Sequence, residues 1–390
     1  MDLFRQKTVK WLKGNWVLLV ISVSGLVLRL LGLINIRLAG DNVIFWSAAR
    51  SIVETGKLPL LGPSASVNAN FHLGPAYYYF LSIPYFLGSG NFNFAIVFSA
   101  VINSFSIPLL YLVSRSWFSK GDSLKITALF AFSSYIVSVQ SFPWNPYFLP
   151  FLIILSLYFI VKINEKKYFF FPLLCMVWGI SIQLHATALF LLPVFAYLLP
   201  LKKISVKQYL LGLTAFLIVN SSWLYVNLTT NFSQMKEAIL IFSSGPTGNC
   251  TFSYWLLNHG HGERCFAYLR NTLFAFRFMT MSLFNSENMI LVFSAMIITI
   301  LYFIKAQMSE KKILLVWLGI PIGLFLFYSS GIYLHYFLIL TPLPFFLLVK
   351  LLAKLNKFGR KGILLGKAII ILTIILNIVG YIYSLQFIRG

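Results

Sequence analysis

The sequence predicts an all-α integral membrane protein with about eleven transmembrane helices. Of its 390 residues, 59% are hydrophobic and only 10% are charged, whereas a soluble domain carries about 25% charged residues. Apolar runs of roughly 17 to 25 residues, each long enough to cross a bilayer, recur from end to end. They contain Gly and Pro without a dominant alternating pattern, so helices are favoured over a barrel.

The apolar runs form a single polytopic domain, residues 1–390, without repeats. The first run is longer than a signal-peptide core and is followed by no small-residue cleavage site, so we expect it to be retained. An odd number of crossings places the carboxyl terminus outside. We expect spans at roughly residues 15–36, 91–114, 124–141, 147–163, 168–184, 186–201, 208–227, 288–305, 312–330, 332–350 and 363–384.

The basic residues lie at alternate ends of these spans. The net charge is +22, and 22 of the 31 Lys and Arg fall at one set of span ends. This positive-inside bias explains the charge without nucleic acid and predicts a multi-pass plasma-membrane protein with a cytoplasmic amino terminus. All five histidines then lie near the outer face, where we expect an extracytoplasmic active site. The basic clusters are Arg5 to Lys13, Arg115 to Lys125, Lys162 to Lys167, Lys202 to Lys207, Lys305 to Lys312 and Lys350 to Lys367.

The first long outer segment, residues 37–90, predicts two interfacial helices. The first, residues 43–54, places Ile44, Phe45, Ala48 and Ile52 on one face and pairs Arg50 with Glu54 at i,i+4 on the other. A Gly/Pro/Ser/Asn loop follows, from Lys57 to Asn70. A second short apolar helix then begins within residues 71–80 and ends near Gly88.

The second long outer segment, residues 228–287, contains three kinds of candidate. Cys250 and Cys265 form a disulfide or remain free thiols, both open at this stage, whereas Cys175 lies in a span. His259 and His261 form a weak metal-binding pattern with Glu263. The outer cations Arg264, Arg270 and Arg277 are placed to meet either a phosphate, a solvated surface or lipid headgroups.

Asp41 is the leading catalytic candidate. It is the only acid between Asp2 and Glu54, and it follows directly on the first apolar run. A carboxylate at the mouth of a membrane span is costly to desolvate, and such residues tend to be functional. Asp41 is either a general base for an acceptor hydroxyl or only a cap for the interfacial helix.

Two outer turns carry further candidates for substrate binding. His72, in His72-Leu-Gly-Pro75, lies on the same loop as Asp41, although Gly74 and Pro75 also suit a plain loop-to-helix junction. Tyr78 contributes either to a site or to an aromatic belt. Trp144 and Asn145 are suited to stacking on a sugar and hydrogen bonding to it, although an interfacial Trp is the commoner explanation.

Polar residues at the outer ends of later spans complete the set. Gln183 and His185 end the fifth span, and His335 begins the tenth. Polar groups in such places face a cavity or bond neighbouring helices. We therefore consider phosphate binding and helix–helix hydrogen bonding equally for these three residues.

These motifs resemble the GT-C-type glycosyltransferases of the bacterial protein-mannosyltransferase/aminoarabinose-transferase superfamily. Asp41 follows the first span in a Gly-Asp element, and Glu54-Thr-Gly-Lys57 is similar to the end of the family's "ArExxxxGdw" pattern. Phe71-His-Leu-Gly-Pro-Ala-Tyr-Tyr-Tyr stands where the family has "His-x-Gly-Pro-Leu-Tyr-Tyr". Weaker matches follow at Trp144-Asn-Pro, Gln183-Leu-His and Leu334-His-Tyr-Phe.

The resemblance implies a transferase that moves a monosaccharide from a polyprenyl-phosphate donor to a glycan, lipid or protein acceptor. Asp41 would be the base, and His185, His335 or Arg270 would hold the phosphate. Many relatives have Asp-Glu where this chain has Asp41-Asn42. No cofactor is required by this scheme, and a divalent metal ion bound by His72 is the alternative. Mannose, another hexose and a pentose all stay open, and with no carboxy-terminal soluble domain the acceptor would be recognised by the outer loops.

The reaction implied is an inverting transfer, because one carboxylate base suffices when no covalent enzyme intermediate forms. Retaining glycosidases use two carboxyl groups about 5 Å apart, and the outer face shows no obvious pair. A transporter or lipid flippase is the first rival. A transporter needs polar groups along the length of its spans. The mid-span regions of this chain are nearly free of ionisable residues, apart from Arg29. An enzyme that transfers a whole oligosaccharide is the second rival.

Overall fold

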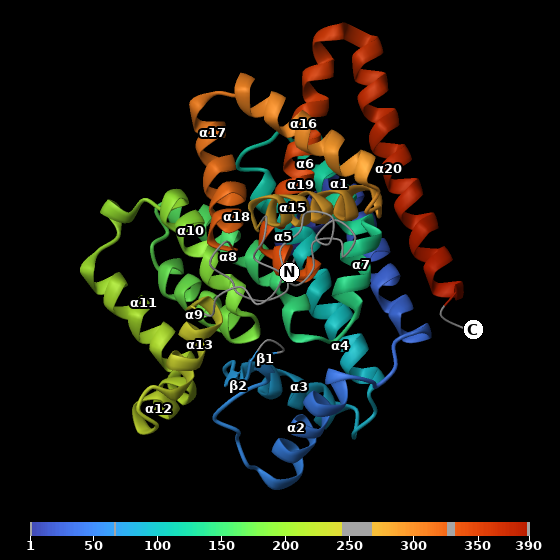
Figure 1. Cartoon of the computed structure of the whole chain (residues 1–390). Helices are drawn as coiled ribbons and strands as arrows, with labels where there is room; N and C mark the ends of the chain where they lie inside the picture. Colours follow the sequence, from blue (N-terminus) through green and yellow to red (C-terminus); the bar gives the residue numbers. More distant parts are fainter. Residues whose placement is uncertain (1, 66–67, 244–266, 326–331, 388–390) are drawn as a thin grey trace.

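Helices make up nearly all of the protein in a computed structural model that describes residues 2–65, 68–243, 267–325 and 332–387 (Figure 1). The first half contains α1 (Asp2–Leu30), η1 (Leu31–Ile34), α2 (Asp41–Thr55), β1 (Ser64–Ala65), β2 (Asn68–His72), α3 (Ala76–Leu87), α4 (Asn93–Ser104), α5 (Ser106–Ser114), α6 (Lys120–Phe132), α7 (Ser134–Ser141), η2 (Asn145–Phe148), α8 (Leu149–Asn164) and α9 (Phe170–Leu184). The second half contains η3 (Ala186–Leu191), α10 (Leu192–Leu198), η4 (Leu201–Lys203), α11 (Val206–Val219), α12 (Ser221–Thr229), α13 (Ser233–Ser243), α15 (Ala267–Phe284), α16 (Met289–Lys305), α17 (Met308–Leu314), η5 (Leu315–Gly319), α18 (Ile320–Leu324), η7 (Leu334–Leu340), α19 (Leu343–Ala353), η8 (Lys354–Phe358) and α20 (Gly359–Phe387).

Within the described residues each expected span falls on helical segments, which confirms the all-α membrane class. In the described residues four stretches are long and apolar enough to cross a bilayer, and three bent helix pairs raise that number to seven. The expected count of eleven is not confirmed. Many of the expected crossings are helices that bend or are interrupted by a few residues, so helix length alone does not show that they cross the bilayer. The four stretches are Gly14–Ile34, Asn93–Ser114, Asn145–Asn164 and Leu343–Leu385.

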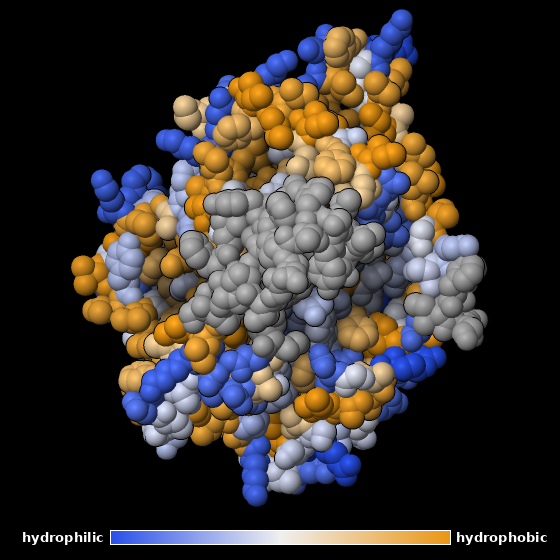
Figure 2. All heavy atoms as spheres, viewed as in Figure 1, coloured by the Kyte–Doolittle hydropathy of each residue, from blue (hydrophilic) through white to orange (hydrophobic). Residues whose placement is uncertain are grey.

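The two ends of the molecule have different characters. Figure 1 shows α2, α3 and the β1–β2 hairpin together at one end and the turn between α19 and α20 at the other. Gly359, with φ of 64°, lies at this turn, next to the basic η8. Between the ends, apolar side chains on α16 and α20 face outward, among them Ile290, Ile297 and Ile371 (Figure 2). Such exposed apolar helix faces are suited to contact with lipid tails.

The break between α6 and α7 shows how polar groups are satisfied inside the helical core. These helices meet at an angle of 58° at Ser133, which frees backbone groups that a continuous helix would pair. Arg29 Nη1 donates to the Ala131 carbonyl over 3.1 Å, and the Asn377 Oδ1 accepts from the Ser134 N–H over 2.8 Å. Asn377 Nδ2 in turn donates to the Leu283 carbonyl over 2.7 Å. The mid-span Arg29 thus acts as a structural donor to this break.

The first outer segment folds as two helices and a hairpin. The i,i+4 pair of Arg50 and Glu54 is confirmed at 2.9 Å, and α3 ends before Gly88 as expected. Of the expected apolar face, Phe45 is buried together with Trp46 and Ala49, whereas Ile44 is exposed. The interval 57–70, expected to be loop throughout, contains β1 and part of β2, which pair antiparallel with Ser64 opposite His72.

Candidate functional site

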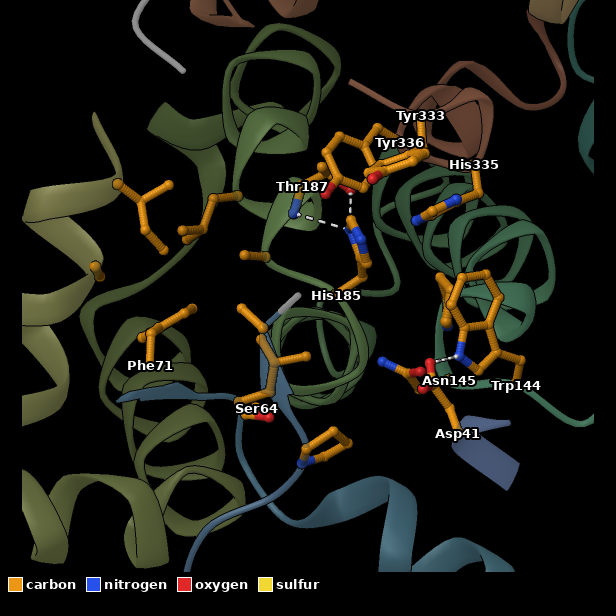
Figure 3. A pocket seen from close by; sticks show the side chains of 18 of the residues that line it. Asp41, Ser64, Phe71, Trp144, Asn145, His185, Thr187, Tyr333, His335 and Tyr336 are labelled. Carbon is orange, nitrogen blue, oxygen red and sulfur yellow. Dashed lines mark hydrogen bonds between the residues drawn. The ribbon is translucent and has the colours of Figure 1, made fainter. Parts of the chain in front are cut away.

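A cavity of about 420 Å³ lies where the hairpin and α2 meet the turns of the helical core (Figure 3). Its volume is within the range of small-molecule sites. No lysine or arginine from the described ranges lines it. Its walls are mostly apolar and aromatic, and its polar lining comes from Asp41, Ser64, Asn145, His185, Thr187, Tyr333, His335 and Tyr336.

Asp41 lies at the edge of this cavity and does not cap α2. Gly40 is the residue before the helix, with φ of 57° and no side-chain cap, and Asp41 is the first helical residue. Its Oδ2 instead accepts a hydrogen bond of 3.2 Å from the indole N–H of Trp144. Within the described part of the chain Oδ1 has no hydrogen-bond partner. One carboxylate oxygen is therefore oriented by the protein and the other is available to a substrate.

The neighbouring residue Asn145 also contributes to the cavity. It begins η2, which Trp144 precedes in an extended conformation. Its Nδ2 donates to the carbonyl of Leu184 over 2.7 Å, which ties η2 to the end of α9. The turn predicted from Trp144-Asn-Pro146 thus brings Asn145 beside His185 and Trp144 beside Asp41.

His185 occupies the junction between α9 and η3. Its Nδ1 lies 2.7 Å from Thr187 Oγ1 and accepts from the Thr187 backbone N–H over 3.4 Å. Figure 3 shows the ring between Thr187 and the cavity. Burial lowers the pKa of His185 to about 4, so the imidazole is neutral at pH 7.

A cluster of rings continues the wall from His185 to Trp144. The His335 ring lies 5.5 Å from the His185 ring and 4.8 Å from the Trp144 ring, measured between centroids. Tyr333 stacks on His335 with an interplanar angle of 14°, and Tyr336 lies 5.0 Å from His185. Two of the candidate histidines, His185 and His335, thus face one cavity, together with two tyrosines that sequence reasoning passed over.

The motif at residues 72–75 builds the loop that closes the cavity on one side. A Cβ on Gly62 would lie 2.0 Å from the Gly74 carbonyl, and one on Gly74 would lie 2.3 Å from Gln183 Oε1. Both glycines therefore lie in close contact with their neighbours. Gln183 Oε1 accepts from the Ala76 N–H over 3.1 Å and its Nε2 donates to the Val219 carbonyl over 2.6 Å. Gln183 thus fixes the loop from behind.

Several expected site residues do not line the cavity. His72 bonds the Gly62 carbonyl through Nδ1 at 3.1 Å, and Tyr78 packs against Phe45. Arg270 is fully buried in α15, away from the cavity lining. Arg264, His259 and His261 lie outside the described residues, as do Cys250 and Cys265.

The described residues contain no second carboxylate at the cavity and no group of side chains suited to hold a metal ion. Glu54, at the far end of α2, is engaged by Arg50, whose hydrogen bond holds the pKa of Glu54 below its ordinary value. In the ranges the structure describes, no three His, Cys, Asp or Glu side chains converge on one point. His72 thus has no described partners for a metal ion, and metal dependence stays untested.

Thr187 and the two tyrosines were missed for a physical reason. Thr187 follows His185 by two residues, a spacing at which a side chain caps a helix start, and this signal was available in the sequence. Tyr333 and Tyr336 flank His335 but resemble ordinary interfacial aromatic residues. The contact between Trp144 and Asp41 joins positions 103 residues apart, which no local pattern reports.

Comparison with known proteins identifies the fold. No family model and no curated protein matches the sequence. The structure of ArnT from Cupriavidus metallidurans in the apo state matches with a TM-score of 0.57 and 15% identity over 89% of this chain. The oligosaccharyltransferase AglB from Archaeoglobus fulgidus, in complex with an inhibitory peptide and a dolichol-phosphate, matches with a TM-score of 0.46 and 14% identity over 95% of this chain.

The chain spans 62% of ArnT and 56% of AglB. The likeness to ArnT shows that the chain has a GT-C-type membrane fold. The fold expected from the sequence motifs is thereby confirmed.

Proposed function

We propose that the protein is a membrane glycosyltransferase that transfers a monosaccharide from a polyprenyl-phosphate donor to an acceptor hydroxyl. The observation that carries the proposal is the position of Asp41, whose carboxylate lies at the edge of an aromatic cavity with one oxygen held by Trp144. The cavity volume of about 420 Å³ suits one sugar better than a long glycan. The fold it shares with ArnT supports the same class by analogy.

The proposed reaction needs one base and one anion-stabilising wall. The Asp41 Oδ1 accepts the proton of the acceptor hydroxyl while the hydroxyl oxygen attacks C1 of the sugar. The bond between C1 and the phosphate oxygen breaks, and its electron pair leaves with the phosphate. Since this is a single displacement, the configuration at C1 inverts.

The lipid tail of the donor would lie outside the cavity, against the apolar faces of the molecule. α2 begins with exposed Val43 and Ile44 beside Asp41, which are suited to the membrane interface. We propose that the site faces the extracytoplasmic side of the plasma membrane, opposite the basic turn between α19 and α20. The acceptor, whether glycan, lipid or protein, would approach from the aqueous side.

The proposal is tested by transfer from radiolabelled polyprenyl-phosphate mannose, glucose and arabinose in membranes that contain the wild type or Asp41→Asn. We expect label to reach an acceptor with the wild type and to be lost in the variant at equal expression. Equal transfer by both proteins would remove Asp41 as the base. A rival flippase would move the lipid-linked sugar across vesicles without forming any glycosylated product.

A further inference from the structure

In the proposed function a phosphate leaves C1 of the sugar, and this phosphate requires hydrogen-bond donors on the wall that faces Asp41. The inference about these donors rests on the proposed function. The described lining offers no lysine or arginine there. It offers instead two imidazoles, the Thr187 hydroxyl and two tyrosines. The protonation state of His185 therefore determines whether this wall presents a donor or an acceptor to an anion.

The contacts of Thr187 select one tautomer of His185. A backbone N–H can only donate, and that of Thr187 points at His185 Nδ1 over 3.4 Å. Nδ1 must then carry a lone pair, so the 2.7 Å contact with Thr187 Oγ1 is a bond donated by the hydroxyl. In a neutral ring with Nδ1 as acceptor, the proton lies on Nε2.

This tautomer directs an N–H group away from Thr187. The two ring nitrogens of imidazole point in widely different directions, so a group bonded to Nδ1 leaves Nε2 free for another. His185 lines the cavity, and its Nε2 has no hydrogen-bond partner in the described residues. The rings of His335 and Tyr336 flank it without a hydrogen bond to it (Figure 3).

We propose that His185, held by Thr187 as the Nε2–H imidazole, donates this N–H to a non-bridging oxygen of the polyprenyl phosphate that leaves C1. The proton stays on Nε2 throughout, and the electron pair of the broken C1–O bond stays on the phosphate. Thr187 is a positioning residue, since it acts only through the ring. A neutral donor suits this wall because a cation would need a counter-charge whenever the cavity is empty.

Binding tests the proposal without any transfer assay. Protein labelled with ¹⁵N-histidine contains five histidines, and the His185 signals are identified by their absence in His185→Asn. We expect a neutral Nε2–H ring at pH 7 and a shift of its Nε2–H signal when a short-chain prenyl phosphate is added. The prenyl alcohol of the same length has the tail without the anion and should leave this signal unchanged.

The ligand series separates the possible outcomes. A shift with inorganic phosphate as well assigns recognition to the anion itself and supports the proposal. An Nδ1–H or charged ring, or an equal shift with the alcohol, overturns it. Binding is measured without any transfer reaction. A protein that lacks transferase activity but still shows the shift with prenyl phosphate would therefore count against the proposed function and not against phosphate binding by His185.

Activity variants give a second, independent test once the donor is known. In His185→Gln the amide lies near the position of Nε2 and retains a donor, whereas in His185→Asn it lies near Nδ1. We expect His185→Asn to lower kcat about 100-fold with little change in KM, and His185→Gln to recover part of this loss. Equal losses in both variants would contradict the assignment of the donor to Nε2.

The role of Thr187 is tested in parallel. Thr187→Val removes the hydroxyl that donates to Nδ1, and Thr187→Ser restores it. Thr187→Val keeps the backbone N–H that points at Nδ1, so we expect a smaller fraction of the Nε2–H ring than in the wild type and a lower kcat, and we expect Thr187→Ser to resemble the wild type. Thr127→Val is the matched control, since Thr127 is also buried and its hydroxyl donates to the Ser123 carbonyl of its own helix. An unchanged tautomer and an unchanged kcat in Thr187→Val would remove the Thr187 hydroxyl from the positioning role.

Discussion

The indole N–H of Trp144 donates to Oδ2 of Asp41 across 3.2 Å. This bond joins the turn before η2 to the start of α2, and it holds a carboxylate that the adjacent helix does not use as a cap. The same indole ring contacts His335 at 4.8 Å between centroids. Trp144 therefore connects the proposed base to the ring cluster that contains His185.

Trp144→Phe should lower kcat about tenfold while the protein remains folded. The change keeps an aromatic ring at this position, smaller than the indole, and removes the N–H that orients Asp41, one hydrogen bond to a charged group. Steady-state transfer with the identified donor measures the effect. Trp46→Phe is the control, because the Trp46 indole N–H also donates a hydrogen bond, in its case to the Gly90 carbonyl, but Trp46 does not line the cavity. Equal losses in both variants would contradict the orienting role.

Acid should destabilise the protein through His185. Its folded pKa is lowered to about 4, whereas an unfolded histidine has a pKa of about 6.5. The unfolded state thus binds more protons between these values, and stability falls as the pH drops from about 6.5 to about 4. The titratable groups that share its cavity are His335 and Tyr336 from η7, Tyr333 directly before η7, and Asp41 from α2.

The pH effect is measured as the thermal midpoint in detergent across that interval. His185→Asn should show a smaller decline than the wild type, because one proton-binding difference is removed. Identical declines would show that other groups, such as His335, account for the acid sensitivity.

Asn377→Ala should lower the free energy of unfolding by about 3 kcal/mol. The change leaves the Ser134 N–H and the Leu283 carbonyl buried without their partner, and each such group costs about 1–3 kcal/mol. Thermal unfolding in detergent detects the loss. Asn356→Ala, at an exposed position in η8, is expected to change little. A wild-type midpoint in Asn377→Ala would show that the break between α6 and α7 does not depend on this side chain.

The product should have the anomeric configuration opposite to that of the donor. A single carboxylate at the cavity edge favours one direct displacement, and Glu54 is engaged by Arg50 and Tyr85 rather than placed as a second carboxylate. The configuration of the isolated product, determined by NMR coupling at C1, decides the point. A retained configuration would require a covalent intermediate and would exclude the mechanism proposed for Asp41.

The sequence predicted the helical membrane class, the helix at Asp41 and five of the residues that line the cavity. Those successes depend on local signals: apolar run length, the i,i+4 pair of Arg50 and Glu54, and polar residues at the ends of spans. The hairpin at β1–β2 was missed because its strands are short, two residues in β1 and five in β2. Gln183 was misplaced because an amide at a span end fits both a site and a backbone clamp, and only tertiary structure distinguishes them.

The most direct test of the central claim is the rate of sugar transfer by purified protein with Asp41→Asn beside Glu54→Gln. Both changes remove one carboxylate from α2, but only Asp41 lines the cavity. We predict a loss of at least about 100-fold in kcat for Asp41→Asn and near wild-type transfer for Glu54→Gln, with both variants folded. Transfer by Asp41→Asn at the rate of the wild type would contradict Asp41 as the base.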